Sequence, residues 1–155
     1  MLLYNIGIRL YECSAAIAGL WSSKARKWRM GRQELLETIT QSMKPHERRV
    51  WIHAASLGEF EQGRPVIEQL KRAYPDIKVV LTFFSPSGYE IRKDYPNADY
   101  VFYIPADTKR NAREFLDIVN PEVVIFVKYE FWLNMLAELR RRSIRTFIVS
   151  AIFRR

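Results

Sequence analysis

Residues 50–60 read Val-Trp-Ile-His-Ala-Ala-Ser-Leu-Gly-Glu-Phe, a β-favouring apolar run that leads into a loop with a glycine and an acid. Similar short apolar runs follow along the chain, and stretches with helical spacing separate them. The predicted strands are residues 50–55, 77–83, 100–104, 123–127 and 146–150. Because these runs are nearly continuous, each strand should be covered on both faces, as in a parallel sheet with right-handed crossovers. The sequence therefore predicts an α/β, Rossmann-like domain over residues 48–155, with helices on both faces of the sheet.

The loops that follow the predicted strands are the candidate site, because ligands of such sheets bind beyond the carboxyl ends of the strands. Two loops place a carboxylate near a strand end, Glu59 and Glu130. Either acid can act as a general base, or it can be a first-turn residue stabilised by the helix dipole. Gly58 would permit a tight turn and close approach of a ligand, and Lys128 is available as an ion-pair partner for Glu130.

Other polar residues of the loops have equally ordinary explanations. Ser85-Pro-Ser-Gly88 can present hydroxyl and N–H groups to a phosphate, or it can simply cap a short helix. Thr108 has the position of another N-cap. His53 lies inside the first strand, and the pattern favours a hydrogen-bonded core histidine, because His46 is the only other histidine and no metal-ligand spacing exists. The sequence contains no glycine-rich dinucleotide-binding motif, no P-loop motif and no nucleophile elbow of an α/β-hydrolase.

The chain is basic overall, but its positive charge is unevenly distributed along the sequence. It has 155 residues, one cysteine and a net charge of +8. Residues 50–139 carry ten Lys/Arg against thirteen Asp/Glu, so the excess lies at the two ends. Nucleic-acid binders usually spread basic residues over the recognition surface, and this pattern argues against a nucleic-acid partner.

The N-terminal segment, residues 1–32, reads as an amphipathic helix followed by a basic linker. Residues 1–21 are too polar for a typical spanning helix, and Trp21 and Trp28 flank the lysines and arginines that follow. Aromatic and basic residues beside an apolar helix suit the headgroups of an anionic membrane. We expect an interfacial membrane anchor, with a spanning helix or a helix packed on the domain as the alternatives.

Five segments together resemble one family. They are Trp51-Ile-His-Ala-Ala-Ser-Leu-Gly-Glu59, Thr82-Phe-Phe-Ser-Pro-Ser-Gly88, Tyr103-Ile-Pro-Ala-Asp107, Glu130-Phe-Trp-Leu-Asn134 and Ser150-Ala151. Their order and spacing are similar to those of the 3-deoxy-D-manno-octulosonic acid (Kdo) transferases. The chain departs from the common family pattern at Lys128, where many members have an acid, and at Leu133, where they have a proline.

The resemblance implies the N-terminal, acceptor-binding half of a GT-B glycosyltransferase, with the C-terminal donor domain absent. Members work at the cytoplasmic face of the bacterial inner membrane and transfer Kdo from CMP-Kdo to a lipid A precursor, in lipopolysaccharide biosynthesis. The reaction inverts the anomeric centre and needs neither a metal nor a cofactor. We would expect a half of this kind to be inactive alone.

The resemblance also assigns roles to residues. Glu59 corresponds to the family's general base, and Glu130 would assist it or position the acceptor. The acceptor-binding residues would be Ser56, Gly58, Ser85, Ser87, Gly88, Lys128 and Trp132. The alternatives are a non-catalytic Rossmann-like module that binds a membrane surface, and a GT-B transferase for another nucleotide sugar.

Overall fold

Five parallel strands form a single sheet in the computed structural model, which describes residues 2–151. The order across the sheet is β3-β2-β1-β4-β5. The strands are β1 (Arg49–Ala54), β2 (Lys78–Phe83), β3 (Tyr100–Tyr103), β4 (Val123–Val127) and β5 (Arg145–Val149). Each lies within one or two residues of a predicted strand, so the predicted Rossmann-like sheet is confirmed.

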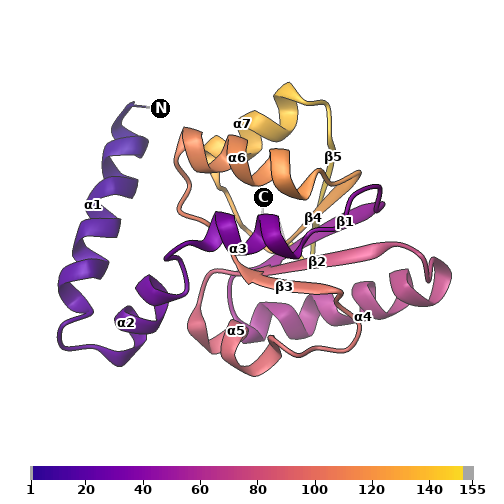
Figure 1. The fold of residues 1–155 in the computed structure, drawn as a ribbon, viewed down its shortest axis with the longest axis horizontal. Coiled ribbons are helices and arrows are strands. Elements are labelled where there is room, and N and C mark those ends of the chain that lie inside the picture. Colours follow the sequence, from indigo (N-terminus) through magenta and orange to yellow (C-terminus); the bar gives the residue numbers. More distant parts are fainter. Residues whose placement is uncertain (1, 152–155) are drawn as a thin grey trace.

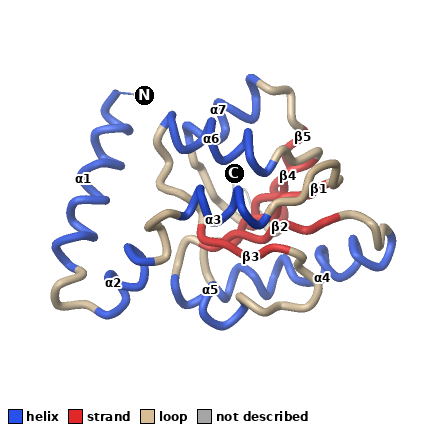
Figure 2. The backbone as a smooth tube through the Cα atoms, in the orientation of Figure 1, coloured by secondary structure: helices blue, strands red, loops and turns tan. Residues whose placement is uncertain are grey.

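Helices cover both faces of the sheet (Figures 1 and 2). Helices α4 (Leu57–Ala73) and α5 (Pro86–Arg92) pack on one face, and α3 (Leu35–Ser42), α6 (Lys109–Val119) and α7 (Leu133–Arg141) pack on the other. Successive side chains of a strand point to opposite faces, so Val50 and Ile52 join the core beneath α4, whereas Trp51 joins the core beneath α6. The two cores are what fix the register of the strands.

Two helices precede this domain and stand beside it. Helix α1 (Leu2–Ala18) leads into α2 (Ser23–Met30), and we call this pair the N-terminal hairpin. Figure 1 shows the pair flanking one end of the sheet. Part of the segment predicted as a basic linker within residues 1–32 is helical, because Ser22 Oγ caps α2 by accepting from the N–H of Ala25 and Trp28 is buried. Helix α3 was not predicted either.

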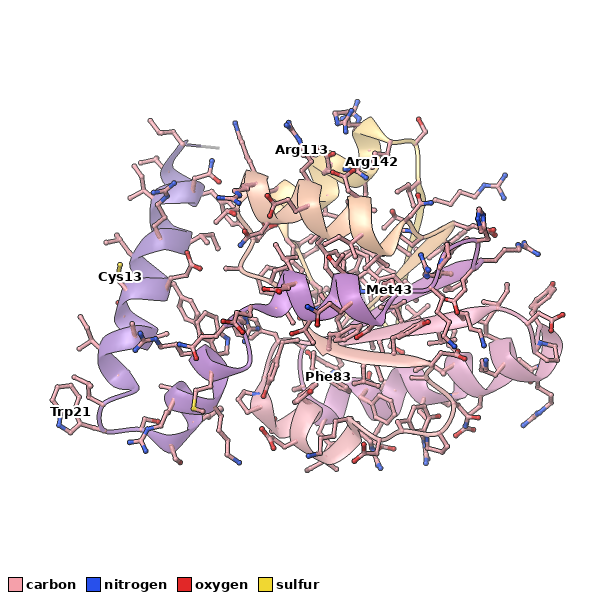
Figure 3. All side chains as sticks on the ribbon, viewed as in Figure 1. Cys13, Trp21, Met43, Phe83, Arg113 and Arg142 are labelled. Carbon is pink, nitrogen blue, oxygen red and sulfur yellow. The ribbon has the colours of Figure 1, made fainter. Side chains whose placement is uncertain are left out.

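Helix α1 presents its larger apolar side chains to solvent rather than to the domain. Leu3, Leu10 and Ile17 on α1 are exposed, as are Leu20 and Trp21 just after it, and Trp21 is 80% exposed. Figure 3 shows the side chains of Cys13 and Trp21 on the side of this hairpin that faces away from the sheet. Within residues 2–151, the structure contains no helix with both the length and the apolar character that crossing a membrane requires.

Candidate functional site

The site predicted at the strand ends lies where the order of the strands reverses. Strand β1 sits between β2 and β4, and the helices that follow β1 and β4 run to opposite faces of the sheet. This divergence leaves a crevice beyond the carboxyl ends of the two strands, which is the usual ligand position in open α/β sheets. Glu59 follows β1 and Glu130 follows β4, so both predicted catalytic acids lie beside this crevice.

A cavity of about 540 Å³ opens beside Glu59. One wall comes from the loops after β1 and β2, with Ser56, Glu59 and Ser85. The opposite wall comes from α1 and α2, and it includes Lys24 and Trp28. The N-terminal helices therefore form part of the candidate site itself. Sequence reasoning missed this contribution, because it expected a membrane anchor over residues 1–32 and gave a helix packed on the domain only as an alternative, with no part in the site.

Glu59 serves the fold and lines the cavity at the same time. Its Oε2 accepts hydrogen bonds from the backbone N–H of Ser56, at 3.0 Å, and from Ser56 Oγ, at 3.2 Å, in a capping arrangement at the start of α4. No residue among those described hydrogen bonds to Oε1. The two interpretations of Glu59 are thus compatible, because one oxygen holds the helix end and the other is available to a ligand.

The side chains of Trp132 and His53 lie against one oxygen of the Glu130 carboxylate. The indole Nε1 of Trp132 donates a hydrogen bond of 2.7 Å to its Oε2, and His53 Nε2 lies 3.4 Å from the same oxygen. The ion pair that Lys128 could have made with Glu130 is not formed in the described chain. Lys128 instead turns the loop in a left-handed conformation, with φ of 65°, and its backbone N–H bonds to Val149 O.

His53 is completely buried, and its Nδ1 lies 2.8 Å from Thr82 Oγ1. The expectation of a hydrogen-bonded core histidine is therefore confirmed. Thr82 is the register partner of His53 on the neighbouring strand β2. The same hydroxyl oxygen accepts a hydrogen bond of 2.8 Å from Trp51 Nε1. A row of polar contacts thus runs beneath the site, from Trp51 through Thr82 and His53 to Glu130.

The loop after β2 behaves mainly as a helix cap. Ser85 Oγ accepts from the N–H of Ser87 and lies 2.9 Å from Ser87 Oγ, while Ser87 itself is exposed. Gly88 is buried, and a Cβ there would meet the ring of Phe83 at 2.3 Å. Gly88 is therefore a packing position. The N-cap interpretation of this segment, and that of Thr108, are confirmed by these contacts and by the bond from the N–H of Asn111 to Thr108 Oγ1.

Gly58 lies within the first turn of α4 and does not make a tight turn. No glycine of the described chain has a positive φ. A Cβ at Gly58 would also meet nothing within 4 Å. The fold therefore does not use the tight turn that a glycine would permit, and the close approach of a ligand to Gly58 stays a prediction.

Two further groups at the site were not predicted. Asp107 is buried and accepts hydrogen bonds from the backbone N–H groups of Asn134 and Met135 and from the hydroxyl of Tyr4. Burial raises the pKa of Asp107 above its ordinary value and also raises the pKa of Tyr4. The available signal was the acid at the end of the segment Tyr103–Asp107, three residues after a predicted strand, but the partners of Asp107 lie far away in the sequence.

The second unpredicted group is Arg32, which closes the base of the N-terminal hairpin. Its guanidinium lies 4.1 Å from the ring centroid of Trp28 and 5.1 Å from that of Phe84, and it donates a 3.0 Å hydrogen bond to Phe84 O. Burial lowers the pKa of Arg32 to about 9. The contacts fasten α2 to the loop after β2, and so hold the two walls of the cavity together.

The chemistry available at the site is that of carboxylates and hydroxyls. Among residues 2–151, no group of three or more His, Cys, Asp or Glu side chains is arranged to hold a metal ion. Glu59 can accept a proton, and Ser56, Ser85 and Lys24 can hydrogen bond to a polar ligand in the cavity.

Comparison with known proteins identifies relatives of this chain. Residues 25–155 match the family described as 3-deoxy-D-manno-octulosonic-acid transferase (kdotransferase). A 3-deoxy-D-manno-octulosonic acid transferase of Haemophilus influenzae is 29% identical over 134 residues, which are 86% of this chain and 31% of that protein. The enzyme of the same name from Aquifex aeolicus is 31% identical over 97 residues, 62% of this chain and 27% of that protein.

A bifunctional glycosyltransferase/methyltransferase of Fusobacterium nucleatum is more distant, at 25% identity over 107 residues, 67% of this chain and 17% of that protein. The chain thus spans less than a third of the length of these relatives. The family match nevertheless covers most of the chain, including Glu59 and Glu130, and we conclude that the chain belongs to the Kdo transferase family.

Proposed function

We propose that this chain is the acceptor-side domain of a two-domain GT-B transferase that moves Kdo from CMP-Kdo to a lipid A precursor, in lipopolysaccharide biosynthesis. The observation that carries the proposal is the position of Glu59. Its carboxylate lines the cavity, one oxygen is fixed by Ser56, and Oε1 has no partner among the described residues. Membership of the Kdo transferase family supplies the reaction class.

In the proposed reaction, Glu59 Oε1 accepts the proton of an acceptor hydroxyl as that oxygen attacks the anomeric carbon of Kdo. The new bond forms as the bond from the anomeric carbon to the phosphate of CMP breaks, and the anomeric configuration inverts. CMP leaves with the electron pair of the broken bond, held by donors of the other domain. The hydrogen bonds from Ser56 keep the carboxylate oriented during the transfer.

The other residues predicted to bind the acceptor differ in how directly they can contact a ligand beside Glu59. Ser56 and Ser85 line the cavity, so they are placed to contact the acceptor. Trp132 and Glu130 are joined by a hydrogen bond beside Phe84, whose ring centroid lies 5.2 Å from that of Trp132. Lys128 has no ion-pair partner among the described residues, so its ammonium group is available to an anionic acceptor. Ser87 and Gly88 have the weaker case, because Ser87 serves the helix cap with Ser85 and Gly88 is a buried packing position.

We also propose that the N-terminal hairpin rests on the cytoplasmic face of the inner membrane. Its apolar side chains point outward, and the lysines and arginines of α2 lie beside them. Such a surface suits anionic lipids. It would present the cavity, whose wall α1 and α2 form, to a lipid-linked acceptor.

The membrane proposal can be tested by co-sedimentation with vesicles that contain, or lack, anionic lipid. We expect the protein to bind the anionic vesicles, and L10E and L20E to weaken that binding. I91E replaces another exposed apolar residue on α5 and should bind like the wild-type protein. Equal binding by L10E, L20E and the wild-type protein would contradict the proposal.

The assignment of Glu59 is tested in a complete two-domain enzyme that carries this chain. Removal of a general base slows catalysis by about 10²–10⁴-fold, so E59Q should lose Kdo transfer while keeping its melting temperature. E61Q is the matched control, because Glu61 lies on the same helix in ion pairs with Arg64 and Arg92. Near-normal transfer by E59Q would exclude Glu59 as the base. We further expect the 155-residue chain alone to transfer no Kdo.

A further inference from the structure

One ring nitrogen of His53 is buried, unpaired and directed at Glu130. The side chain is completely buried, and Nε2 has no hydrogen-bond partner among residues 2–151. Oε2 of Glu130 lies 3.4 Å from Nε2, which is within ion-pair distance but outside good hydrogen-bond geometry. Buried polar atoms are normally paired, so an unpaired one at the edge of a functional site calls for an explanation.

The proton on His53 can be placed from the groups that face its two ring nitrogens. Trp51 Nε1 can only donate, so Thr82 Oγ1 accepts that bond, and the hydroxyl hydrogen of Thr82 can be donated to His53 Nδ1. In that arrangement the proton of a neutral His53 resides on Nε2. The opposite tautomer would turn a lone pair of Nε2 toward a carboxylate oxygen, which is repulsive. A doubly protonated ring also carries a proton on Nε2. Every favourable state therefore directs an N–H at Glu130.

We infer that His53 is a positioning residue for Glu130. Its Nε2–H and the Nε1–H of Trp132 approach the same carboxylate oxygen, Oε2, at 3.4 Å and 2.7 Å. The hydrogen bond from Trp132 and the contact with His53 restrain the carboxylate from one side and leave the other oxygen, Oε1, for the acceptor.

The fold holds His53 firmly enough for such a role. It lies on the central strand β1, and its register partners are Thr82 on β2 and Phe126 on β4. The rings of Phe126 and Trp132 pack edge-on against it, with centroids 6.0 Å and 5.8 Å away. A side chain locked by packing and by its hydrogen bond to Thr82 can transmit a fixed orientation to the group that it touches. Neither His53 nor Glu130 lines the cavity beside Glu59, and His53 is completely buried, so any effect of His53 on a ligand in the crevice after β4 passes through Glu130.

The inference rests on the proposed transferase activity, and a matched pair of variants tests it in the complete two-domain enzyme. H53N keeps a polar atom near the position of Nδ1, within reach of Thr82, but is too short to contact Glu130. H53Q is one methylene longer and restores an N–H near the position of Nε2. We expect kcat of H53N to fall about tenfold to a hundredfold, KM for CMP-Kdo to stay unchanged, and H53Q to recover most of the loss.

The E130Q background separates positioning from packing. If His53 acts through Glu130, H53N and H53Q should differ in kcat in the wild-type background and be equal in the E130Q background. Equal losses in both backgrounds, or no loss by H53N, would overturn the inference. H46N, at the exposed histidine before β1, is the control and should leave kcat unchanged.

A failure of the proposed function would be recognised separately. If the wild-type two-domain enzyme transferred no Kdo, the transferase assignment would be wrong. Urea unfolding of the 155-residue chain would then test whether His53 and Glu130 interact. Non-additive effects of H53N and E130Q on stability would support the contact between the two residues. Additive effects would overturn it.

Discussion

The hydroxyl of Tyr4 donates a 2.6 Å hydrogen bond to Oδ2 of Asp107, across 103 positions of the sequence. The same carboxylate accepts bonds of 2.9 Å from the backbone N–H groups of Asn134 and Met135, and so caps the start of α7. Asn134 Nδ2 also donates to Oδ1 of Asn5 on α1. One buried acid therefore joins the N-terminal helix to the helix that follows the Glu130 loop.

The first prediction concerns this attachment of α1. Y4F removes the hydroxyl that bonds to Asp107 and leaves the ring in place. We expect it to lower the free energy of unfolding by about 1 kcal/mol and to speed amide hydrogen exchange in α1 more than in the strands. Y11F is the control, because the Tyr11 ring packs on Trp28 while its hydroxyl has no hydrogen-bond partner in the described chain. Equal rates of amide hydrogen exchange in α1 of Y4F and Y11F would contradict the role of the Tyr4–Asp107 bond in attaching α1.

The second prediction concerns Asp107 as a cap. In D107N, the single amide oxygen cannot replace two carboxylate oxygens that accept three hydrogen bonds. We expect a loss of about 2 kcal/mol in the free energy of unfolding, more than for Y4F, measured by urea denaturation. Because Tyr4 and Asp107 share one bond, the double variant should lose less than the sum of the two single losses. A simple sum would indicate that they act independently.

The strands and the two acids were predictable because their signals are local. An apolar run bounded by turn residues marks a strand, and the parallel topology then brings the loops after β1 and β4 to one edge. Glu59 and Glu130 needed no further information to be placed there. The bond between Tyr4 and Asp107 could not be predicted, because no periodicity or spacing links residues so far apart.

The two short helices before β1 were missed for physical reasons. Helix α3 begins after Glu34, which has a left-handed φ of 54° and makes no side-chain cap, so its start carries no sequence signal. It is held instead by burial of Leu35 and Ile39 against the core. Helix α2 depends in the same way on burial of Trp28. Tertiary packing commonly stabilises helices of this length, which are marginal alone.

The third prediction concerns the dependence of stability on pH. Hydrogen bonds from Arg141, and then from Arg142, lower the pKa of Glu138 to about 2, and Arg142 also bonds to Arg113 O on α6 (Figure 3). Because the folded pKa is lower than the ordinary value of 4.5, the ionised Glu138 stabilises the fold above pH 4.5, and this contribution disappears as the pH falls toward 2.

We therefore expect E138Q to be less stable than the wild-type chain by about 1 kcal/mol at pH 7, with the difference shrinking below pH 4.5, as measured by urea unfolding across that range. E114Q removes the acid of an exposed pair with Arg110 on α6 and should have a smaller effect. A difference between E138Q and wild type that stayed constant down to pH 2 would show that the ion pairs do not cause it.

The fourth prediction separates two glycines to which the family resemblance gives the same role. In G88A, the new methyl group would meet the ring of Phe83 at 2.3 Å, and this ring is completely buried and cannot move aside. We expect a loss of about 1–3 kcal/mol in the free energy of unfolding, because added volume strains a close-packed core. This loss would occur whether or not Gly88 contacts an acceptor.

Gly58 tests acceptor binding more directly than Gly88, because a side chain at Gly58 would not disturb the packing of the fold. A Cβ there meets no atom within 4 Å, and alanine favours the helix, so G58A should keep the stability of the wild-type chain or raise it by up to about 1 kcal/mol. If an acceptor must approach the backbone beside Glu59, G58A will nevertheless lose Kdo transfer in the complete enzyme. A stable and inactive G58A would locate the acceptor at the start of α4. A stable and fully active one would remove Gly58 from the acceptor site and leave Ser56 and Glu59 to define it.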